Sequence, residues 1–198
     1  MDYTDLTRVK QAMDSQENTA DAILSDYITR ASRLIDRLVV GIPGVQDYFK
    51  SETIANEQLN NGVIDYAGRL TVYPHKPVVT AVTALSYRYT LSHAYTDANI
   101  AMVQPEYEGI LFEGCLPYSE RIYVKCSYTG GFASSTSGLP DDILELGTLM
   151  AVRLYKEARS GLGDSIGVAE LGTLTYTKAL PSRAREIIAL YARTAPWI

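Results

Sequence analysis

The hydrophobic pattern of the chain changes its period twice, and this change limits the possible folds more than any other feature. From residue 19 to 40, apolar side chains recur at helical spacing and form one stripe. From 42 to 139 the period is two, and turn-forming residues recur. From 140 to 160 the helical spacing returns. The sequence therefore predicts two long amphipathic helices with a β-region between them. The stripe of the first long helix consists of Ile23, Leu24, Tyr27, Ile28, Ala31, Leu34, Ile35 and Leu38.

Residues that start and stop helices mark the ends of the long segments. Gly41 and Pro43 end the first, because glycine accepts the left-handed geometry after a helix and proline cannot continue the hydrogen-bond ladder. Pro140 starts the second, and Asp141 and Asp142 then face the positive end of the helix dipole. The apolar faces of both helices are wide, so we expect them to be buried against each other.

Shorter segments complete the helical part. We expect a short helix over 5–13 with Thr4 as its N-cap, and a last helix that opens at Pro181. The stretch Gly161–Tyr176 is polar and rich in glycine, which predicts a loop that is mobile or ordered by a partner.

The middle of the chain has the alternation of half-buried strands. The clearest alternations run over 79–89 and 122–128, and a turn is expected at Asn60–Gly62. Shorter strands are expected over 70–73, 100–103 and 110–112. Ten of the 15 tyrosines fall between Tyr48 and Tyr128, which predicts a continuous tyrosine-lined sheet face.

These elements define a fold of the α+β class. We expect a small α-helical bundle of two long and two short helices, with an antiparallel β-region inserted between the long helices. The predicted parts are the N-terminal helices (1–41), the inserted β-region (42–139), and the C-terminal helices, loop and tail (140–198).

Charge and targeting patterns narrow the function classes. The net charge is -5, so release of counterions from phosphates is not a general source of affinity, and binding of duplex DNA by the whole surface is disfavoured. The first residues are acidic where a secretory signal is basic and then apolar, and no window approaches about 18 apolar residues. We therefore expect synthesis in the cytoplasm and no membrane span.

The sequence predicts no metal or cofactor site. His75, His93, Cys115 and Cys126 are not spaced as paired metal ligands, and two cysteines do not make a disulfide framework. The glycine-rich run from 161 to 167 follows a helix and lacks the Lys-Ser/Thr ending of a phosphate loop.

No catalytic residues are predicted either. Neither histidine lies near a Ser or Cys nucleophile signature. The carboxylate pair Asp141 and Asp142 is explained by its helix start, and Glu106 and Glu108 by an exposed strand.

Several segments together resemble the head-tail connector (adaptor, or head-completion) proteins of long-tailed bacteriophages. Tyr3–Lys10 and Ile28–Asp36 resemble the N-terminal helices of that family. Later segments of this chain resemble the middle part and the third helix of the family, and the order of the segments agrees over most of the chain. The Pro-Asp-Asp-Ile run before an apolar helix is the most specific of them. The segments that match later in the chain are His75–Val79, Ile122–Gly131, Leu139–Ile143 and Leu154–Lys156.

The resemblance implies a structural virion protein without catalysis. Such proteins form a ring, usually of twelve subunits, beneath the portal vertex, and keep an axial channel through which DNA passes without specific binding. Their partners are the portal protein and a stopper or tail-terminator neck protein. Carried onto this chain, the portal-binding positions are Arg193, Trp197 and Ile198. From the sequence alone, Trp197 either packs back on the bundle or anchors a partner.

A ring needs two unlike surfaces on each subunit. The tyrosine-bearing sheet is expected to supply one, through Tyr87, Tyr89, Tyr123 and Tyr128, and mixed-charge helix faces the other. A stopper or terminator role stays open beside the adaptor role. A second reading, from another class, is a carbohydrate- or ligand-binding β-module on a helical stalk, in which the tyrosines cluster in one groove with Asp and Asn.

Overall fold

The computed structural model describes residues 1–14, 21–41, 46–107, 109–159, 165–168, 172–175 and 180–192. The chain divides into two compact units. The helical unit comprises Met1–Asp47 and the described part of Ser135–Arg193, and the sheet unit is built from Tyr48–Ser134. The units meet at 47/48 and 134/135, a few residues from the divisions at 41/42 and 139/140 that the sequence predicts.

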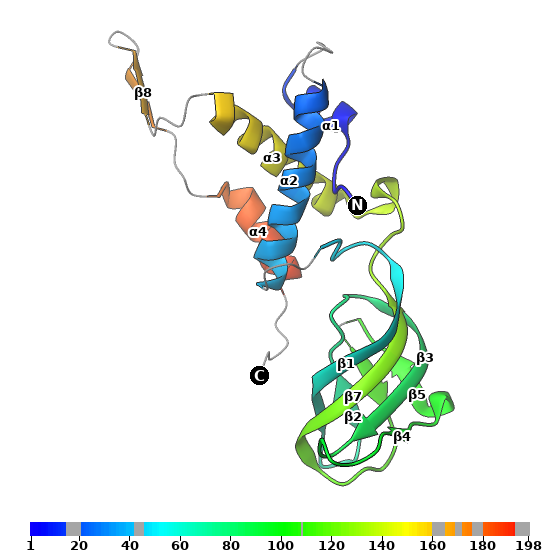
Figure 1. Ribbon diagram of the computed structural model, residues 1–198. Coiled ribbons are helices and arrows are strands. Elements are labelled where there is room, and N and C mark those ends of the chain that lie inside the picture. Colours follow the sequence, from blue (N-terminus) through cyan, green and yellow to red (C-terminus); the bar gives the residue numbers. More distant parts are fainter. Residues whose placement is uncertain are drawn as a thin grey trace. The chain divides into compact units, whose positions relative to one another are not determined.

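The described part of the helical unit contains four α-helices, drawn as coils in Figure 1. They are α1 (Leu6–Ala12), α2 (Asp21–Val40), α3 (Asp141–Arg159) and α4 (Ser182–Tyr191). The helices α2 and α3 pack against each other, and each also contacts α1 and α4. No described helix is long and apolar enough to cross a membrane.

The stripe of α2 predicts its buried face only in part, because Tyr27, Leu34 and Leu38 are half-buried. Leu24, Ile28 and Ile35 are buried, but Ile23 is 53% exposed. Asp36, a polar residue, takes a fully buried place on the same helix. The stripe is therefore narrower at the start of the helix than the sequence predicted.

The cap of α1 is not the residue expected. The side chain of Asp5 accepts a hydrogen bond from the backbone N–H of Arg8 at 2.9 Å and caps the helix. Thr4 is buried instead, and its hydroxyl lies 2.7 Å from that of Thr148 on α3. Spacing from the first apolar residue cannot separate two neighbouring residues that both favour the cap position.

The sheet unit holds one seven-stranded antiparallel sheet, in the order β4-β3-β7-β1-β2-β6-β5. Figure 1 shows these strands strongly curled, and β3 also packs near β5 although no ladder joins them. With the helices, this sheet confirms the α+β class. The strands are β1 (Glu52–Ile64), β2 (Leu70–Val72), β3 (Val79–Arg88), β4 (Thr96–Asp97), β5 (Val103–Pro105), β6 (Ile110–Phe112) and β7 (Ser119–Gly130).

The strand β1 was missed by the sequence analysis, and the turn expected at Asn60–Gly62 lies inside it. Its residues are mostly polar, and its register against β7 shifts three times, so no regular alternation marks it. Gly62 is needed there, because a Cβ at this position would lie 2.4 Å from the Ile122 side chain on β7. Gly62 therefore serves a close strand pairing and not a turn.

The inner face of the sheet encloses one apolar core. On β7, Ile122, Val124, Cys126 and Tyr128 are buried, and the residues between them are partly exposed. The remaining buried members of the core are Leu59, Ile64, Leu70, Val72, Val79, Leu85, Ile110 and Phe112.

Two short paired strands lie in the segment Gly161–Tyr176, which the sequence predicts to be a loop. Strands β8 (Ser165–Val168) and β9 (Gly172–Thr175) pair antiparallel as a separate two-stranded sheet. The sequence did not indicate these strands, because their pattern is too short to be recognised.

Candidate assembly surface

The four tyrosines predicted to form one interface lie on different sides of the sheet. Tyr128 is fully buried, and Tyr87 packs against the inner core, with its ring centroid 6.1 Å from that of Phe112. Tyr89 also packs against this core. Only Tyr123 occupies an outward position of β7. The continuous tyrosine face is therefore not formed, and the buried ring of Tyr128 is not accessible to a partner.

The reason is the alternation of the strand itself. Tyr123 and Tyr128 are an odd number of residues apart on one strand, so their side chains point to opposite faces. In the ladder between β3 and β7, Tyr87 is opposite the buried Val124, whereas Arg88 is opposite Tyr123. Arg88 and Tyr123 therefore share the outer face.

Around Tyr123 the outer face carries a group that we call the cationic–tyrosine patch: Arg88, Tyr95, Arg121, Tyr123 and Lys125. The Cζ of Arg88 lies 4.4 Å from the ring centroid of Tyr95 and 5.7 Å from that of Tyr123. The Cζ of Arg121 lies 5.9 Å from the Tyr123 centroid, and Nζ of Lys125 lies 5.4 Å from the Tyr95 centroid. Cations over aromatic faces are attracted by the ring quadrupole, so the two rings bring three positive charges together.

The patch has no carboxylate within ion-pair distance among the described residues. In the strand register, Asp97 on β4 is the acid closest to the patch. Ser86 on β3 pairs with Asp97 on one side and with Lys125 of β7 on the other. The Oδ1 of Asp97 accepts a hydrogen bond from the Ser86 hydroxyl at 2.7 Å. Arg69 and Lys76 of the same unit do have such partners, in Asp65 and Glu52.

The patch could have been found from the sequence by one signal. Tyr123 and Lys125 alternate along the strand predicted over 122–128, and Arg121 directly before it continues the same alternation, so the three share an outward face. The contribution of Arg88 and Tyr95 needed the register between β3 and β7, which the sequence does not reveal.

A second group of polar side chains lies where β1 meets the segment before β3. Glu57 is largely buried, and its Oε1 lies 2.7 Å from Nδ1 of His75 while its Oε2 accepts a hydrogen bond from the Tyr128 hydroxyl at 2.9 Å. Burial acts to raise the pKa of Glu57, but the contacts with His75 and Tyr128 outweigh it and lower that pKa. Burial, with the charge of Glu57, raises the pKa of Cys126 to about 12. These groups satisfy one another, and a thiol with such a pKa is a poor nucleophile.

A stacked aromatic pair lies on the surface of the sheet unit. The rings of Tyr66 and Tyr118 have centroids 4.3 Å apart and an interplanar angle of 1°. Tyr66 is 89% exposed, and the Tyr118 hydroxyl donates to Glu120 at 3.0 Å. This pair is separate from the patch, so the exposed tyrosines are spread and do not gather in one groove with Asp and Asn.

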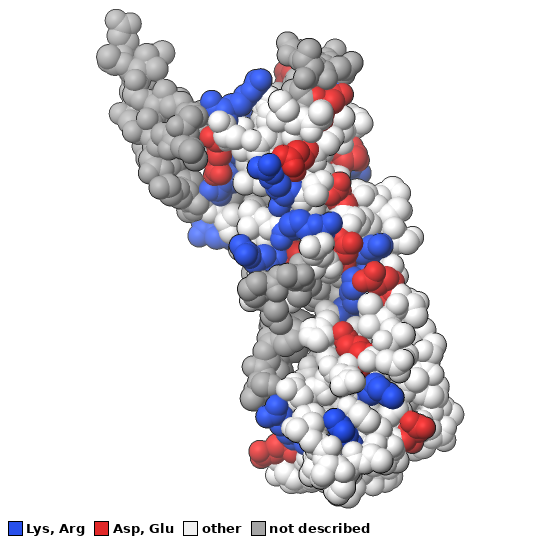
Figure 2. Space-filling view, in the orientation of Figure 1, with Lys and Arg blue, Asp and Glu red and all other residues white. Residues whose placement is uncertain are grey.

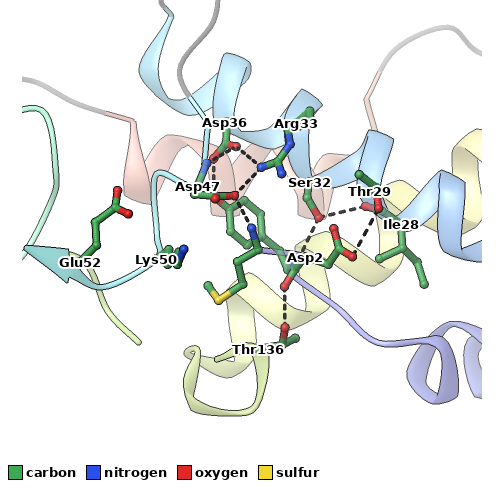
Figure 3. Close-up of polar contacts among 12 residues, drawn as sticks. Asp2, Ile28, Thr29, Ser32, Arg33, Asp36, Asp47, Lys50, Glu52 and Thr136 are labelled. Atoms are coloured by element: carbon green, nitrogen blue, oxygen red, sulfur yellow. Dashed lines mark hydrogen bonds and ion pairs between the residues drawn. The ribbon is translucent and has the colours of Figure 1, made fainter. Parts of the chain in front are cut away.

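In the helical unit, polar contacts join α2 to the segments at both ends of Met1–Asp47 (Figure 3). Arg33 forms ion pairs with Asp47 and, at 3.6 Å, with Asp36. Burial acts to raise the pKa of Asp47, but hydrogen bonds from the N-terminal ammonium and Arg33 lower it to about 2. The hydroxyl of Thr136 donates to the backbone oxygen of Asp2 at 2.7 Å. These contacts tie the start of the chain and Asp47 to α2 within the helical unit.

The other residues considered in the sequence have structural contacts or lie outside the described part. The predicted portal-binding residues Arg193, Trp197 and Ile198 are outside it. Asp142 accepts hydrogen bonds from the Tyr191 hydroxyl at 2.8 and 2.9 Å. Cys115 is exposed and Cys126 is buried. Among the described residues no group of His, Cys, Asp and Glu is arranged to hold a metal ion.

The distribution of charge differs between the two parts on the face shown in Figure 2. Lys and Arg are interspersed with Asp and Glu over the helices, whereas the strands show mostly uncharged surface. Neither sign forms a continuous area there, which suits protein contacts more than the tracking of a nucleic-acid backbone.

Comparisons with known proteins identify a shared fold. No protein-family model and no curated protein matches the chain. A chain in the neck of an empty gene transfer agent (GTA) particle, computed with C6 symmetry, is 16% identical with a TM-score of 0.51, over 99% of this chain and 92% of that chain. A chain in the virion of a native GTA particle is 19% identical over 92% of this chain and 82% of that one, with a TM-score of 0.45. The sequence resemblance to head-tail connector proteins points to the neck of a particle. The chain therefore shares its fold with a chain from that part of a GTA particle.

Proposed function

We propose that this protein is a structural component of the neck of a phage-like particle, a head-tail connector of the adaptor type. In this role it forms a ring beneath the portal vertex and joins the DNA-filled capsid to the neck and tail. One observation carries the proposal: the fold is shared with a chain of a GTA neck over 99% of this chain and 92% of that chain. The connector-like segments of the sequence support the same role independently of the fold.

The proposed ring contains twelve copies, in which the two long and two short helices act as a small bundle. Twelve copies also satisfy the sixfold symmetry with which the similar GTA neck was computed. A ring closes through a head-to-tail contact between two unlike surfaces of each copy. The outer sheet face with Tyr123 and the mixed-charge helix faces are two such surfaces.

The net charge of -5 supports a passive channel. A wall that is neutral to negative does not hold phosphates, so DNA slides past without tight binding. We propose no catalytic step and no cofactor. The C-terminal residues Arg193, Trp197 and Ile198 are the proposed portal contacts, and a stopper or tail-terminator protein is the proposed partner on the other side.

The distribution of tyrosines disfavours the carbohydrate-binding alternative. A sugar site needs aromatic faces beside Asp or Asn in one groove. In the described residues, Tyr95 and Tyr123 lie instead beside Arg and Lys, and Tyr66 stacks on Tyr118.

Cryo-microscopy of the particle that contains this chain tests the proposal. The expected result is a ring between portal and tail whose density fits both the helices and the seven-stranded sheet. A particle whose neck lacks this chain, or a location on the capsid surface or tail fibre, contradicts the proposal. Measurable glycan binding by the purified chain, without incorporation into a neck, favours the alternative.

A further inference from the structure

The cationic–tyrosine patch brings three positive charges together without a carboxylate partner among the described residues. Arg88, Arg121 and Lys125 converge on the rings of Tyr95 and Tyr123, and no carboxylate of the described residues neutralises them. Like charges brought together repel one another, so an added negative group stabilises the patch. Arginine and tyrosine are also the residue types that dominate binding energy at protein interfaces.

The side chains beside the patch on β7 and β3 are short and uncharged. The next outward positions of β7 are Ser127 and Thr129, opposite Ala84 and Ala81 on β3. Thr53 on β1 lies opposite Thr129, with the two hydroxyl oxygens 3.0 Å apart. Short side chains on a sheet let another protein approach closely, with the cations at one end of the contact.

This arrangement suits a protein better than a nucleic acid. Duplex DNA carries one charge per about 1.7 Å of its axis, so proteins that bind it place cations along a track. Here the cations are confined to one end of the strands, and the following outward positions of β7 are Ser127 and Thr129. The ring faces that would stack on bases are partly covered by Arg88 and Lys125.

The chain itself supplies complementary charge. Residues 48–134 contain six Lys and Arg and eight Asp and Glu, a net charge of -2. Three of the six cations are in the patch, so the acids are in excess over the rest of this unit. Glu106 and Glu113 are exposed, and neither has an ion-pair partner among the described residues. One copy therefore carries both a cationic patch and exposed carboxylates elsewhere.

We propose that the cationic–tyrosine patch binds carboxylates of a second copy of this chain and forms one side of the head-to-tail contact. This inference rests on the proposed ring, and names the surface that closes it. The contact is heterologous, because the patch and the carboxylates that it meets belong to different regions of the subunit.

Photo-cross-linking in assembled particles tests the identity of the occupant. The side chain of Tyr123 is replaced by p-benzoylphenylalanine, and irradiated particles are analysed by denaturing electrophoresis and mass spectrometry. The expected adduct has twice the mass of the chain, and joins residue 123 to a region outside the patch. An adduct with nucleic acid or with another protein, or no adduct from a chain that is present in the neck, overturns the proposal.

Charge reversal tests the chemistry. Arg121→Glu and Lys125→Glu are chosen because Arg88 also donates to the backbone oxygen of Leu91 at 3.2 Å and supports its loop. We expect each to reduce incorporation of the chain into particles about tenfold or more, the scale of a lost interfacial charge pair. The control Arg69→Glu, an exposed residue of the sheet unit outside the patch, makes the same change in net charge and loses only a surface ion pair with Asp65, so it is expected to incorporate normally. Circular dichroism shows whether each variant is folded.

The two proposals fail in different ways. If wild-type chain is absent from the neck, the proposed function is wrong. If it forms the neck ring and both patch variants incorporate as the wild type does, the function stands and the patch proposal is wrong.

Discussion

The hydroxyl of Tyr3 donates a hydrogen bond to Oδ1 of Asp36, and both residues are fully buried. The other carboxylate oxygen, Oδ2, accepts from the backbone N–H of Asp47 at 2.9 Å and lies 3.6 Å from Arg33 (Figure 3). A buried carboxylate is tolerated only when its oxygens have such partners. Asp36 therefore holds together the start of the chain, α2 and the segment that ends the first part of the helical unit.

Replacing Tyr3→Phe removes one partner of this carboxylate without removing the ring. We expect the free energy of unfolding to fall by about 1–3 kcal/mol, the cost of leaving a buried polar group unsatisfied. Denaturant titration followed by the helical circular-dichroism signal measures it. Tyr66→Phe is the matched control, since Tyr66 is 89% exposed, and should change stability little. Equal effects of the two substitutions would contradict the structural role of Asp36.

Gly147 on α3 lets the N-terminal segment approach the helix. A Cβ at this position would lie 2.6 Å from the backbone oxygen of Tyr3. Replacing glycine by alanine inside a helix usually stabilises by about 1 kcal/mol. For Gly147→Ala we expect the opposite sign, a loss of about 1–3 kcal/mol from overpacking. A higher melting temperature for this variant would show that the close approach is absent.

Acid sensitivity should depend on Asp47. Its pKa is lowered from 3.8 to about 2 by hydrogen bonds that outweigh burial, so the folded state favours the carboxylate. The resulting stability is present above about pH 4 and is lost as the pH falls toward 2. Asp47→Asn should lower stability at neutral pH and flatten the stability curve in that window. Unfolding at a series of pH values tests this, and an unchanged slope would refute it.

The two thiols should differ sharply in reactivity. Cys115 is exposed, whereas Cys126 is buried, and burial together with Glu57 raises its pKa to about 12. A thiolate is the reactive form, so Cys126 should resist alkylation in the folded state. We expect an alkylating reagent at neutral pH to modify one cysteine per native chain and both in denaturant, as read by mass spectrometry. The variant Cys115→Ser should then show no rapid labelling, and rapid labelling of Cys126 would mean that the sheet core opens.

The prediction of elements worked where the pattern is long and local. The helices α2 and α3 and the strand β3 lie within the segments expected from their periods, and β7 contains the alternation expected over 122–128 and extends beyond it at both ends. The strand β1 was missed because its polar residues are held by pairing with β7, which lies far along the chain. The cap of α1 was misplaced by one residue, since Thr4 and Asp5 both suit it.

The candidate site, too, is predictable from the sequence only where local patterns decide it. Its abundance of tyrosine is visible in the sequence, but the side to which each ring points is not. Tyr123 reaches the outer face while Tyr128 enters the core, because the strand alternates. Arg88 and Tyr95 join Tyr123 only through the pairing of β3 with β4 and β7.

By itself the sequence determined the class of the fold and its long elements, because hydrophobic periodicity is a property of neighbouring residues. Only the tertiary structure decided strand register, the burial of Tyr128 with Glu57, and the gathering of Arg88, Arg121 and Lys125 around two rings. Those contacts join residues that are distant in the chain, and their free energy depends on partners that a local pattern does not contain.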